Sequence, residues 1–235
     1  MTVIALDNLP EILTRDLSEK IIRNELKPGE RILEAKVAEE MGVSRSPVRE
    51  SLRMLEKNRL VELIPRKGAR VTDITAQHIE WFYDIFEALY SLVARKAAEH
   101  AEADDIRRMN AALSRIEQAA GKGDVQEYYD GIFEFAEVGM QAARNPLLEQ
   151  TLKELWPSNR RIQYASLLFR KDELRKNVIF FQQMARHIGQ GEGARVETEV
   201  RAYARNEKAF ALKIADRKET AERRKLKKKQ RERGG

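Results

Sequence analysis

Three arginines recur every four residues in one short segment, at Arg45, Arg49 and Arg53, and two serines, Ser44 and Ser46, flank the first of them. A guanidinium group can donate paired hydrogen bonds to O6 and N7 of guanine. Hydroxyl and N–H groups at the start of a helix can hold a phosphate. The segment is therefore suited to the major groove of a nucleic acid, and the alternative is a charged face that only water contacts.

Apolar residues between these arginines predict the helix that presents them. Val48, Leu52 and Leu55 follow one another at i, i+4 and i+7, so they form one helical stripe that must face the core. We expect the helix to run from the proline that follows Ser46 to about residue 58, with Ser46 as its N-cap, because a proline at the first helical position loses no hydrogen bond. The arginines then face solvent.

Two helices precede this one, and a basic hairpin follows it. Apolar periodicity and turn residues predict these elements at 11–26, 34–41, 60–64 and 69–72. The turn of the hairpin contains Arg66, Lys67 and Gly68, and the glycine can adopt a positive φ. Three short helices and a basic hairpin predict a winged helix-turn-helix, whose wing tip would lie against a phosphate backbone or a minor groove.

The positive charge of the chain is concentrated in two segments. Of the net charge of +6, the segment 213–235 contributes eleven basic against four acidic residues, so the remainder carries −1. Within that remainder, 1–43 has six basic against nine acidic residues, whereas 44–70 has eight against three. The arginine helix and the hairpin therefore form one compact basic region, and the C-terminus is a second, more diffuse one.

The composition argues against most enzymes. Cysteine is absent and there are three histidines, which excludes disulfides and thiolate chemistry and leaves little material for imidazole chemistry. No stretch approaches the roughly 18 apolar residues of a membrane span, and the first residues lack the pattern of a signal peptide. We therefore expect a cytoplasmic protein that does not enter a membrane.

Long helical segments with short breakers between them extend from about residue 76 to residue 215. We expect a mainly α protein of three parts: a winged helix-turn-helix over 1–75, an all-helical bundle of about six or seven helices over 76–215, and a basic tail over 216–235. The tail is expected to be disordered, because its like charges repel and it has few apolar residues. It would serve solubility or, alternatively, contact phosphates without regard to sequence.

Four blocks of sequence, at 28–32, 37–39, 42–52 and 65–71, are similar to blocks that occur in the same order in the reader domain of GntR-family transcriptional regulators. This resemblance covers the first third of the chain. Many members carry an arginine just before the core residues of the second helix, where this chain has Ala35 followed by Lys36. The resemblance places Arg45, Arg49 and the Lys67-Gly68 wing tip on DNA. The full set of residues expected to contact DNA is Lys36, Ser44, Arg45, Ser46, Arg49, Arg66, Lys67 and Gly68.

The helical second half resembles the FCD effector domain of the FadR-type branch. In that domain an aspartate followed four residues later by a histidine, together with two later histidines, commonly binds a metal. The corresponding positions here are Asp130, Glu134, Phe181 and Tyr203. Members also often carry an arginine that pairs with an effector carboxylate and a glutamate four residues on, and those places hold Phe86 and Tyr90. The resemblance therefore implies a degenerate site with no transition metal and no cofactor.

These six residues define a candidate effector pocket that is more apolar than the usual site of the family. Each aromatic ring can bury ~150–250 Å² of surface. The pocket would accept a long-chain, acyl-like or aromatic molecule. The alternative is that the rings simply fill the core and no effector binds.

These features predict a DNA-binding transcriptional regulator and no enzyme. We expect a homodimer on a pseudo-palindromic double-stranded operator, because a two-fold pair of reading helices reads two half-sites. Repression, controlled by a small molecule in the helical domain, is the expected mode of action. The alternatives are a metal-dependent sensor or enzyme built on the helical domain, and a nonspecific nucleic-acid binder that acts through the basic tail.

Overall fold

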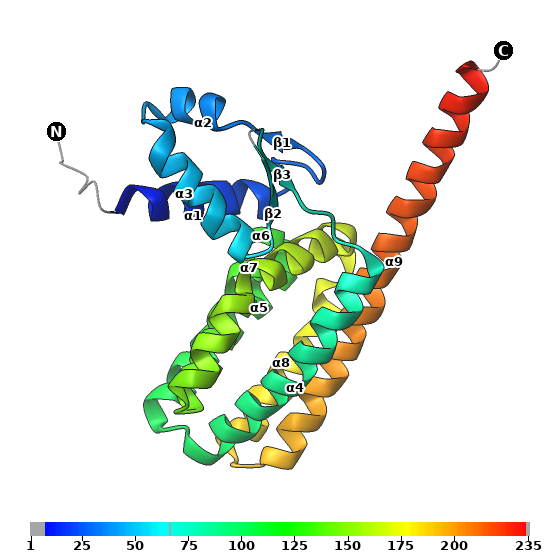
Figure 1. Ribbon diagram of the computed structural model, residues 1–235. Coiled ribbons are helices and arrows are strands. Elements are labelled where there is room, and N and C mark those ends of the chain that lie inside the picture. Colours follow the sequence, from blue (N-terminus) through cyan, green and yellow to red (C-terminus); the bar gives the residue numbers. More distant parts are fainter. Residues whose placement is uncertain (1–7, 66, 234–235) are drawn as a thin grey trace. The chain divides into compact units, whose positions relative to one another are not determined.

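The computed structural model describes residues 8–65 and 67–233, with no side-chain description for 172 and 218–233. The chain divides into two compact units (Figure 1). The first unit comprises residues 1–74 and 153–165, and the second comprises 75–152 and 166–235. The first division thus lies next to the boundary expected at residue 75, whereas the sequence gives no sign that 153–165 groups with the N-terminal part.

Besides its segment of helix α7, the first unit has three helices and three strands among the described residues. They are α1 (Leu9–Ile22), β1 (Arg31–Ile32), α2 (Glu34–Met41), α3 (Arg45–Lys57), β2 (Val61–Ile64) and β3 (Gly68–Val71). β3 is the central strand and pairs antiparallel with both β1 and β2. The arrangement confirms the predicted winged helix-turn-helix and adds β1, which the sequence pattern did not predict.

One hydrophobic core holds α1, α2, α3 and the sheet together. On α3, Val48, Leu52 and Leu55 are completely buried, which confirms the predicted stripe. The rest of this core comes from the other elements and the residues between them: Leu13, Leu17, Ile21, Ile32, Val37, Ala38, Leu60, Val61, Ala69 and Val71.

α3 begins earlier than the sequence predicts. Ser44 is its N-cap residue, with extended backbone at φ −74° and ψ 165°, and Arg45 is the first helical residue. The prediction of Ser46 as the N-cap is therefore wrong. Pro47 is compatible with the earlier start because it still lies in the first helical turn, where N–H groups have no intrahelical acceptor and a proline removes no hydrogen bond.

Gly68 has the positive φ that its place in the hairpin predicts, at +81°. A Cβ at this position would collide with the carbonyl oxygen of Ile32 in β1. Glycine is therefore required here for two reasons, the left-handed backbone and the close approach of two neighbouring strands.

The second unit is all helical in the described residues. Its elements are α4 (Ala76–His100), α5 (Ala103–Lys122), α6 (Val125–Ala142), α7 (Pro146–Phe169), a short 3-10 turn η2 (Lys171–Glu173), α8 (Leu174–Gly189) and α9 (Gly193–Arg233). Side chains of Thr75, Asp124 and Asn145 cap the starts of α4, α6 and α7. Six α-helices agree with the predicted bundle of six or seven.

The helices of the second unit pack both against their neighbours in sequence and against helices far apart in the chain. α4 lies along α9, α5 lies along α6, and α8 contacts both α5 and α9 (Figure 1). Residues from α4, α6, α8 and α9, far apart in the chain, are therefore brought into one interior.

α9 continues as a helix to Arg233, which differs from the disordered tail expected over 216–235. The physical reason is helix propensity, since the segment consists largely of Ala, Glu, Gln, Lys and Arg, which all favour the α conformation. Despite the length of α9, no helix within the described residues is both long and apolar enough to cross a membrane.

The close contact between the hairpin and β1 can be tested with two matched glycines. Gly29 and Gly68 both have left-handed φ, at +77° and +81°, but a Cβ on Gly29 would meet no atom within 4 Å. We expect Gly29→Ala to cost about 1–2 kcal/mol of unfolding free energy for the backbone alone. Gly68→Ala should cost at least ~1 kcal/mol more, because β1 must also move. Equal losses in chemical denaturation of the two variants would contradict the strand contact.

Candidate nucleic-acid interface and effector site

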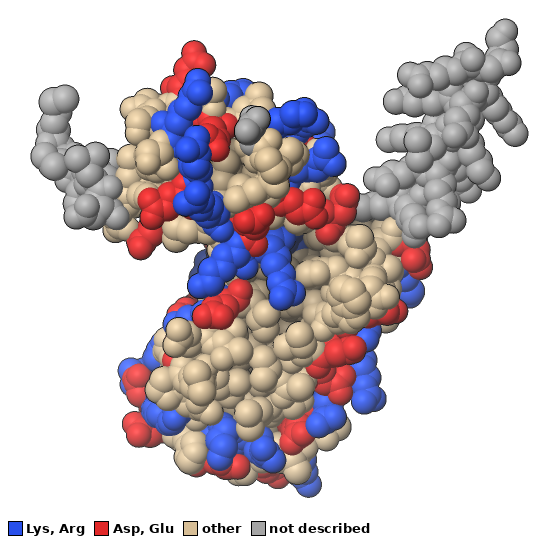
Figure 2. All heavy atoms as spheres, viewed as in Figure 1, with Lys and Arg blue, Asp and Glu red and all other residues tan. Residues whose placement is uncertain are grey.

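α3 presents its arginines to solvent because its opposite face is buried. Arg45, Arg49 and Arg53 are all exposed. Figure 2 shows a band of Lys and Arg side chains over the first unit, with Asp and Glu side chains on either side of it. The predicted basic edge therefore exists on the surface of the winged helix-turn-helix.

Arg49 is exposed but already paired within its own chain. Its Nε and Nη2 atoms donate to Glu34 Oε1 and Oε2 at 3.1 and 2.9 Å, so the guanidinium and the carboxylate meet through two parallel hydrogen bonds. The hydrogen bond from Arg49 holds the pKa of Glu34 below its ordinary value, and the Glu34 carboxylate raises the pKa of Arg49. Glu34 therefore occupies one edge of the guanidinium, and the N–H groups of Nη1 remain available to an incoming phosphate or base.

Arg45 and Arg53 have no hydrogen-bonded or ionic partner among the residues whose side chains are described. Their charges also help to lower the pKa of Glu34, after the larger contribution of Arg49. The first turn of α3 thus offers one unpaired guanidinium, at Arg45, beside one that is paired and exposed. Surface ion pairs contribute little to stability because water screens both charges, so the pairing of Arg49 is exchangeable.

The other predicted contacts of the first unit are placed as follows. Lys36 on α2 is exposed and forms a 3.6 Å ion pair with Glu40 one turn later. Ser44 and Ser46 are exposed at the start of α3. Lys67 is exposed in the hairpin, where its backbone N–H donates to Ile64 O at 2.9 Å. Arg66 lies outside the described residues.

The predicted aromatic residues of the second unit form two pairs. Phe86 and Tyr90 lie one turn apart on α4, with ring centroids 4.3 Å apart. Phe181 on α8 and Tyr203 on α9 are both buried, with centroids 5.1 Å apart and rings nearly edge to face. Phe86, Phe181 and Tyr203 are core side chains, whereas Tyr90 is only partly buried. This burial suits either the predicted apolar pocket or the alternative of ordinary packing.

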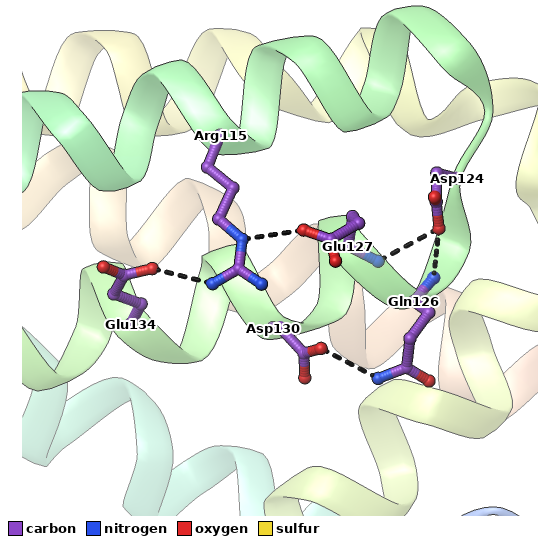
Figure 3. Close-up of polar contacts among 6 residues, drawn as sticks. All are labelled: Arg115, Asp124, Gln126, Glu127, Asp130 and Glu134. Atoms are coloured by element: carbon purple, nitrogen blue, oxygen red, sulfur yellow. Dashed lines mark hydrogen bonds and ion pairs between the residues drawn. The ribbon is translucent and has the colours of Figure 1, made fainter.

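Asp130 and Glu134 have polar partners rather than aromatic ones (Figure 3). Asp130 Oδ2 accepts a 3.0 Å hydrogen bond from Gln126 Nε2 on the same helix. Glu134 is exposed and pairs at 3.0 Å with Arg115 of α5, which also binds Glu127 at 2.9 Å. The expectation that Glu134 faces the pocket is therefore wrong, because its position on α6 points its carboxylate at a surface arginine.

The described residues contain no group of three or more His, Asp or Glu side chains that could hold a metal ion. Asp130 and Glu134 do not supply the oxygen shell that a hard cation requires. The residues at the metal positions of the family thus do not fit a metal.

A buried polar cluster that sequence reasoning missed lies in the second unit. Arg170, the residue that ends α7, forms an ion pair with Glu207 of α9, and their side chains are only 3% and 0% exposed. Asn177 Nδ2 of α8 donates to the other carboxylate oxygen of Glu207 at 2.9 Å. The guanidinium of Arg170 also lies 4.9 Å from the ring centroid of Phe210.

Three buried tyrosines lie in the electrostatic field of this ion pair: Tyr83 of α4, Tyr128 of α6 and Tyr203 of α9. Burial, with a further contribution from the Glu207 carboxylate, raises the pKa of all three hydroxyls well above the ordinary value. Burial alone would lower the pKa of Arg170, but Glu207 outweighs it and the pKa is raised. The phenols therefore stay protonated and the ion pair stays charged. We call Arg170, Glu207, Asn177, Tyr83, Tyr128 and Tyr203 the Arg170 cluster.

Two sequence patterns could have revealed this cluster. On α9, buried apolar residues recur at helical spacing, and Glu207 interrupts their stripe between Ala204 and Ala211. At the C-terminal end of α7, two buried polar residues, Ser166 and Arg170, follow each other four positions apart. Charged and polar residues at core positions are rare unless they are paired or functional.

The buried and exposed ion pairs of the second unit should differ sharply in their effect on stability. Glu207→Ala leaves the Arg170 charge buried without its carboxylate and should cost about 3–5 kcal/mol of unfolding free energy. The control Glu134→Ala removes an exposed partner of Arg115 and should cost less than ~1 kcal/mol. Chemical denaturation measures both, and a cost for Glu207→Ala as small as that of the control would show that the pair is not buried.

Comparisons with known proteins place both units in described families. The profile described as "Bacterial regulatory proteins, gntR family" matches residues 11–71, and the profile described as "FCD domain" matches 82–206. Two solved structures share the fold at 19% sequence identity. The structure of Escherichia coli McbR/YncC has a TM-score of 0.77, and the match covers 88% of this chain and 98% of that chain. The structure of a putative transcriptional regulator GntR from Rhodococcus sp. RHA1 has a TM-score of 0.70, and the match covers 86% of this chain and 97% of that chain.

Curated relatives carry regulator names. The uncharacterized HTH-type transcriptional regulator YdhC of Bacillus subtilis is 35% identical over 46% of this chain and 48% of its own. The galactonate operon transcriptional repressor of Escherichia coli is 29% identical over 57% and 66%. The alignments thus span about half to two thirds of these relatives. Since the FCD profile alone covers more than half of the chain and the gntR profile covers the winged helix-turn-helix, this protein belongs to the GntR family of bacterial regulatory proteins, in the branch that carries an FCD domain.

Proposed function

We propose that this chain is a sequence-specific transcriptional regulator that acts on a double-stranded operator as a homodimer. The observation that carries the proposal is the exposed edge of α3, where Arg45 is unpaired and Arg49 is held at the surface in an exchangeable pair. Guanidinium groups in this position of a winged helix-turn-helix can donate to guanine O6 and N7. The two regulatory domains of its family, and the names of its relatives, support the same function.

We propose that Glu34 releases Arg49 when α3 reads a base pair. In the unbound chain the Glu34 carboxylate occupies the Nε and Nη2 donors, one of the two edges through which a guanidinium can bind a guanine. When a phosphate or base replaces Glu34, Arg49 gains a contact with DNA but loses its ion pair with Glu34. The lost ion pair therefore offsets part of the binding free energy that Arg49 contributes. Arg45 has no such competitor among the described side chains, and we propose it as the stronger of the two contacts.

A two-fold arrangement of reading helices accounts for the specificity that one helix cannot supply. A single α3 reaches only a few base pairs, whereas two copies related by symmetry read two half-sites of a pseudo-palindrome. We propose that binding represses transcription by blocking access to the promoter, and that a small molecule in the second unit controls it. Repression is supported by the names of two relatives, the galactonate operon transcriptional repressor and the transcriptional repressor RspR, both of Escherichia coli.

Arginine variants on a selected operator test the assignment of α3. An operator is first obtained by selection from random double-stranded DNA with the full chain. We expect Arg45→Ala and Arg49→Ala each to weaken operator binding by ~1–3 kcal/mol, or roughly 5- to 150-fold. Arg107→Ala, which removes an exposed arginine of α5 paired with Asp104, has the same change in charge and should bind the operator like the wild type.

Glu34→Gln is the matched variant for the pairing of Arg49. It removes the competing charge while keeping the shape of the side chain, so we expect operator affinity to rise severalfold, and the gain should vanish in Glu34→Gln/Arg49→Ala. Binding is measured at two salt concentrations against random DNA, because nonspecific contact through the tail would respond to salt and little to sequence. Wild-type operator affinity in both Arg45→Ala and Arg49→Ala would contradict the proposed function.

A further inference from the structure

Several buried polar atoms of the second unit lack a hydrogen-bond partner among the described residues, and four of them belong to the Arg170 cluster or lie near it in the sequence. These four are the hydroxyl oxygens of Tyr83, Tyr128 and Ser166 and the Nε atom of Arg170. The four residues are at most 5% exposed and come from α4, α6 and α7 with its terminal residue. Buried polar groups in native proteins are nearly always hydrogen-bonded, since an unpaired one loses its water without compensation. Four such atoms in one unit indicate that something else supplies their partners.

These atoms belong to the Arg170 cluster or lie one turn from it. Tyr83 and Tyr128, from two different helices, both lie within the electrostatic influence of Arg170 and Glu207. Ser166 precedes Arg170 by one helical turn on α7, so the two side chains lie on the same face of that helix. These four atoms therefore belong to Arg170 itself, to tyrosines that interact electrostatically with the buried ion pair, or to the residue one turn before Arg170.

The chemistry of these atoms defines what would complete them. An Arg Nε–H can only donate, and protonated tyrosine hydroxyls each have a proton to donate. The raised pKa of both tyrosines keeps these protons in place. Hydroxyl oxygens can also accept, but only a group with acceptor oxygens can take a proton from Arg170 Nε and from the tyrosines alike. A carbonyl oxygen has two lone pairs and can accept from two of these donors at once.

The charge of the cluster favours an uncharged partner. The charges of Arg170 and Glu207 neutralise each other in an ion pair whose side chains are only 3% and 0% exposed. The Glu207 carboxylate also accepts from Asn177, so both of its oxygens are occupied. A ligand carboxylate would add a second negative charge beside Glu207 at a buried position, which is costly unless a new cation accompanies it.

Aromatic rings supply the remaining surroundings of the cluster. Tyr203 packs edge to face against Phe181 at 5.1 Å, and Tyr83 packs against Phe86 at 5.6 Å between ring centroids. Phe210 faces the guanidinium of Arg170. A molecule that reaches the donors therefore meets apolar ring surface around them, which suits an apolar or aromatic body that carries few polar atoms.

We propose that the effector of this regulator is an uncharged carbonyl compound, an ester, lactone, ketone or amide with an apolar or aromatic body, whose carbonyl oxygen accepts hydrogen bonds from Tyr83 and Tyr128. The inference rests on the proposed function, in which a small molecule controls the chain through its second unit. It narrows the acyl-like or aromatic class expected from the sequence to molecules without a carboxylate. Arg170 and Glu207 act as the fixed charge pair that selects against anions.

Thermal unfolding of the full chain with matched neutral and charged probes tests this proposal. The probes are methyl benzoate against benzoate and ethyl butyrate against butyrate, which share a body and differ in the charge of the carboxyl group. We expect at least one ester to raise Tm by roughly 5–10 °C at ~100 times its Kd. We expect both acids to leave Tm unchanged at the same concentrations.

Tyrosine variants test whether the rise in Tm with ester depends on the hydroxyls of Tyr83 and Tyr128. In Tyr83→Phe/Tyr128→Phe the two donors are removed without loss of ring packing, so the ligand-free variant should keep its Tm, and the shift with ester should fall below ~1 °C. Tyr129→Phe is the control, because Tyr129 neighbours Tyr128 on α6, is equally buried and packs against Phe133 at 4.9 Å. This variant should respond to ester like the wild type.

Three outcomes with the probes would overturn the proposal. They are a larger shift with the acids than with the esters, an undiminished shift with ester in the double tyrosine variant, and no shift with either ester at millimolar concentration. A drop in Tm of the ligand-free double variant would show that buried water or another protein group already satisfies the hydroxyls, and it too would overturn the proposal. The experiment contains no DNA, so its failure leaves the operator-binding result untouched, and the two proposals fail separately.

Discussion

Burial of one face of α3 is the constraint on which the account of this protein depends. Val48, Leu52 and Leu55 have no exposed surface, and complete burial of side chains of this size stabilises by about 1.5–3 kcal/mol each. A rotation of α3 that turned its arginines inward would expose these residues and bury guanidinium groups without partners. The core of the first unit therefore fixes the direction of Arg45 and Arg49, and the function follows from that direction.

Ion pairs have different roles in the two units. The pair between Arg49 and Glu34 is exposed and can be exchanged for a ligand, so it suits a surface that must bind and release a polyanion. The pair between Arg170 and Glu207 is buried, so breaking it leaves a charge in the core, and it suits a fixed framework. The same two residue types thus give an exchangeable contact at the surface and a permanent one inside, and solvent exposure decides which.

Much of the fold follows from local sequence signals. The bounds of α2 agree with the prediction, since Gly42 ends it with a left-handed φ of +64°. The stripe of α3 and the hairpin also follow from periodicity and turn residues. β1 was missed because a strand of two residues has no detectable period. The start of α3 was misplaced because both Ser44 and Ser46 are good N-caps, and only tertiary packing chooses between them.

The candidate sites were less predictable because they depend on contacts between distant residues. Glu34 meets Arg49 across 15 positions of sequence, and Arg170 meets Glu207 across 37. No local pattern specifies such partners. Alignment to family positions correctly led to the buried rings of Phe181 and Tyr203, but it also assigned to the pocket Glu134, which the structure has at the surface. Local charge and family position alone did not distinguish a surface carboxylate from a buried one such as Glu207.

Methylation interference on the selected operator tests the central claim most directly, because a methyl group on guanine N7 blocks the atom to which a guanidinium donates in the major groove. We expect methylation of specific guanines in each half-site to abolish binding of the wild-type chain, and the interference at one guanine of each half-site to disappear in Arg45→Ala. If wild type and Arg45→Ala show identical interference, or if no guanine in either half-site is sensitive, the outward edge of α3 does not read the operator and the account is contradicted.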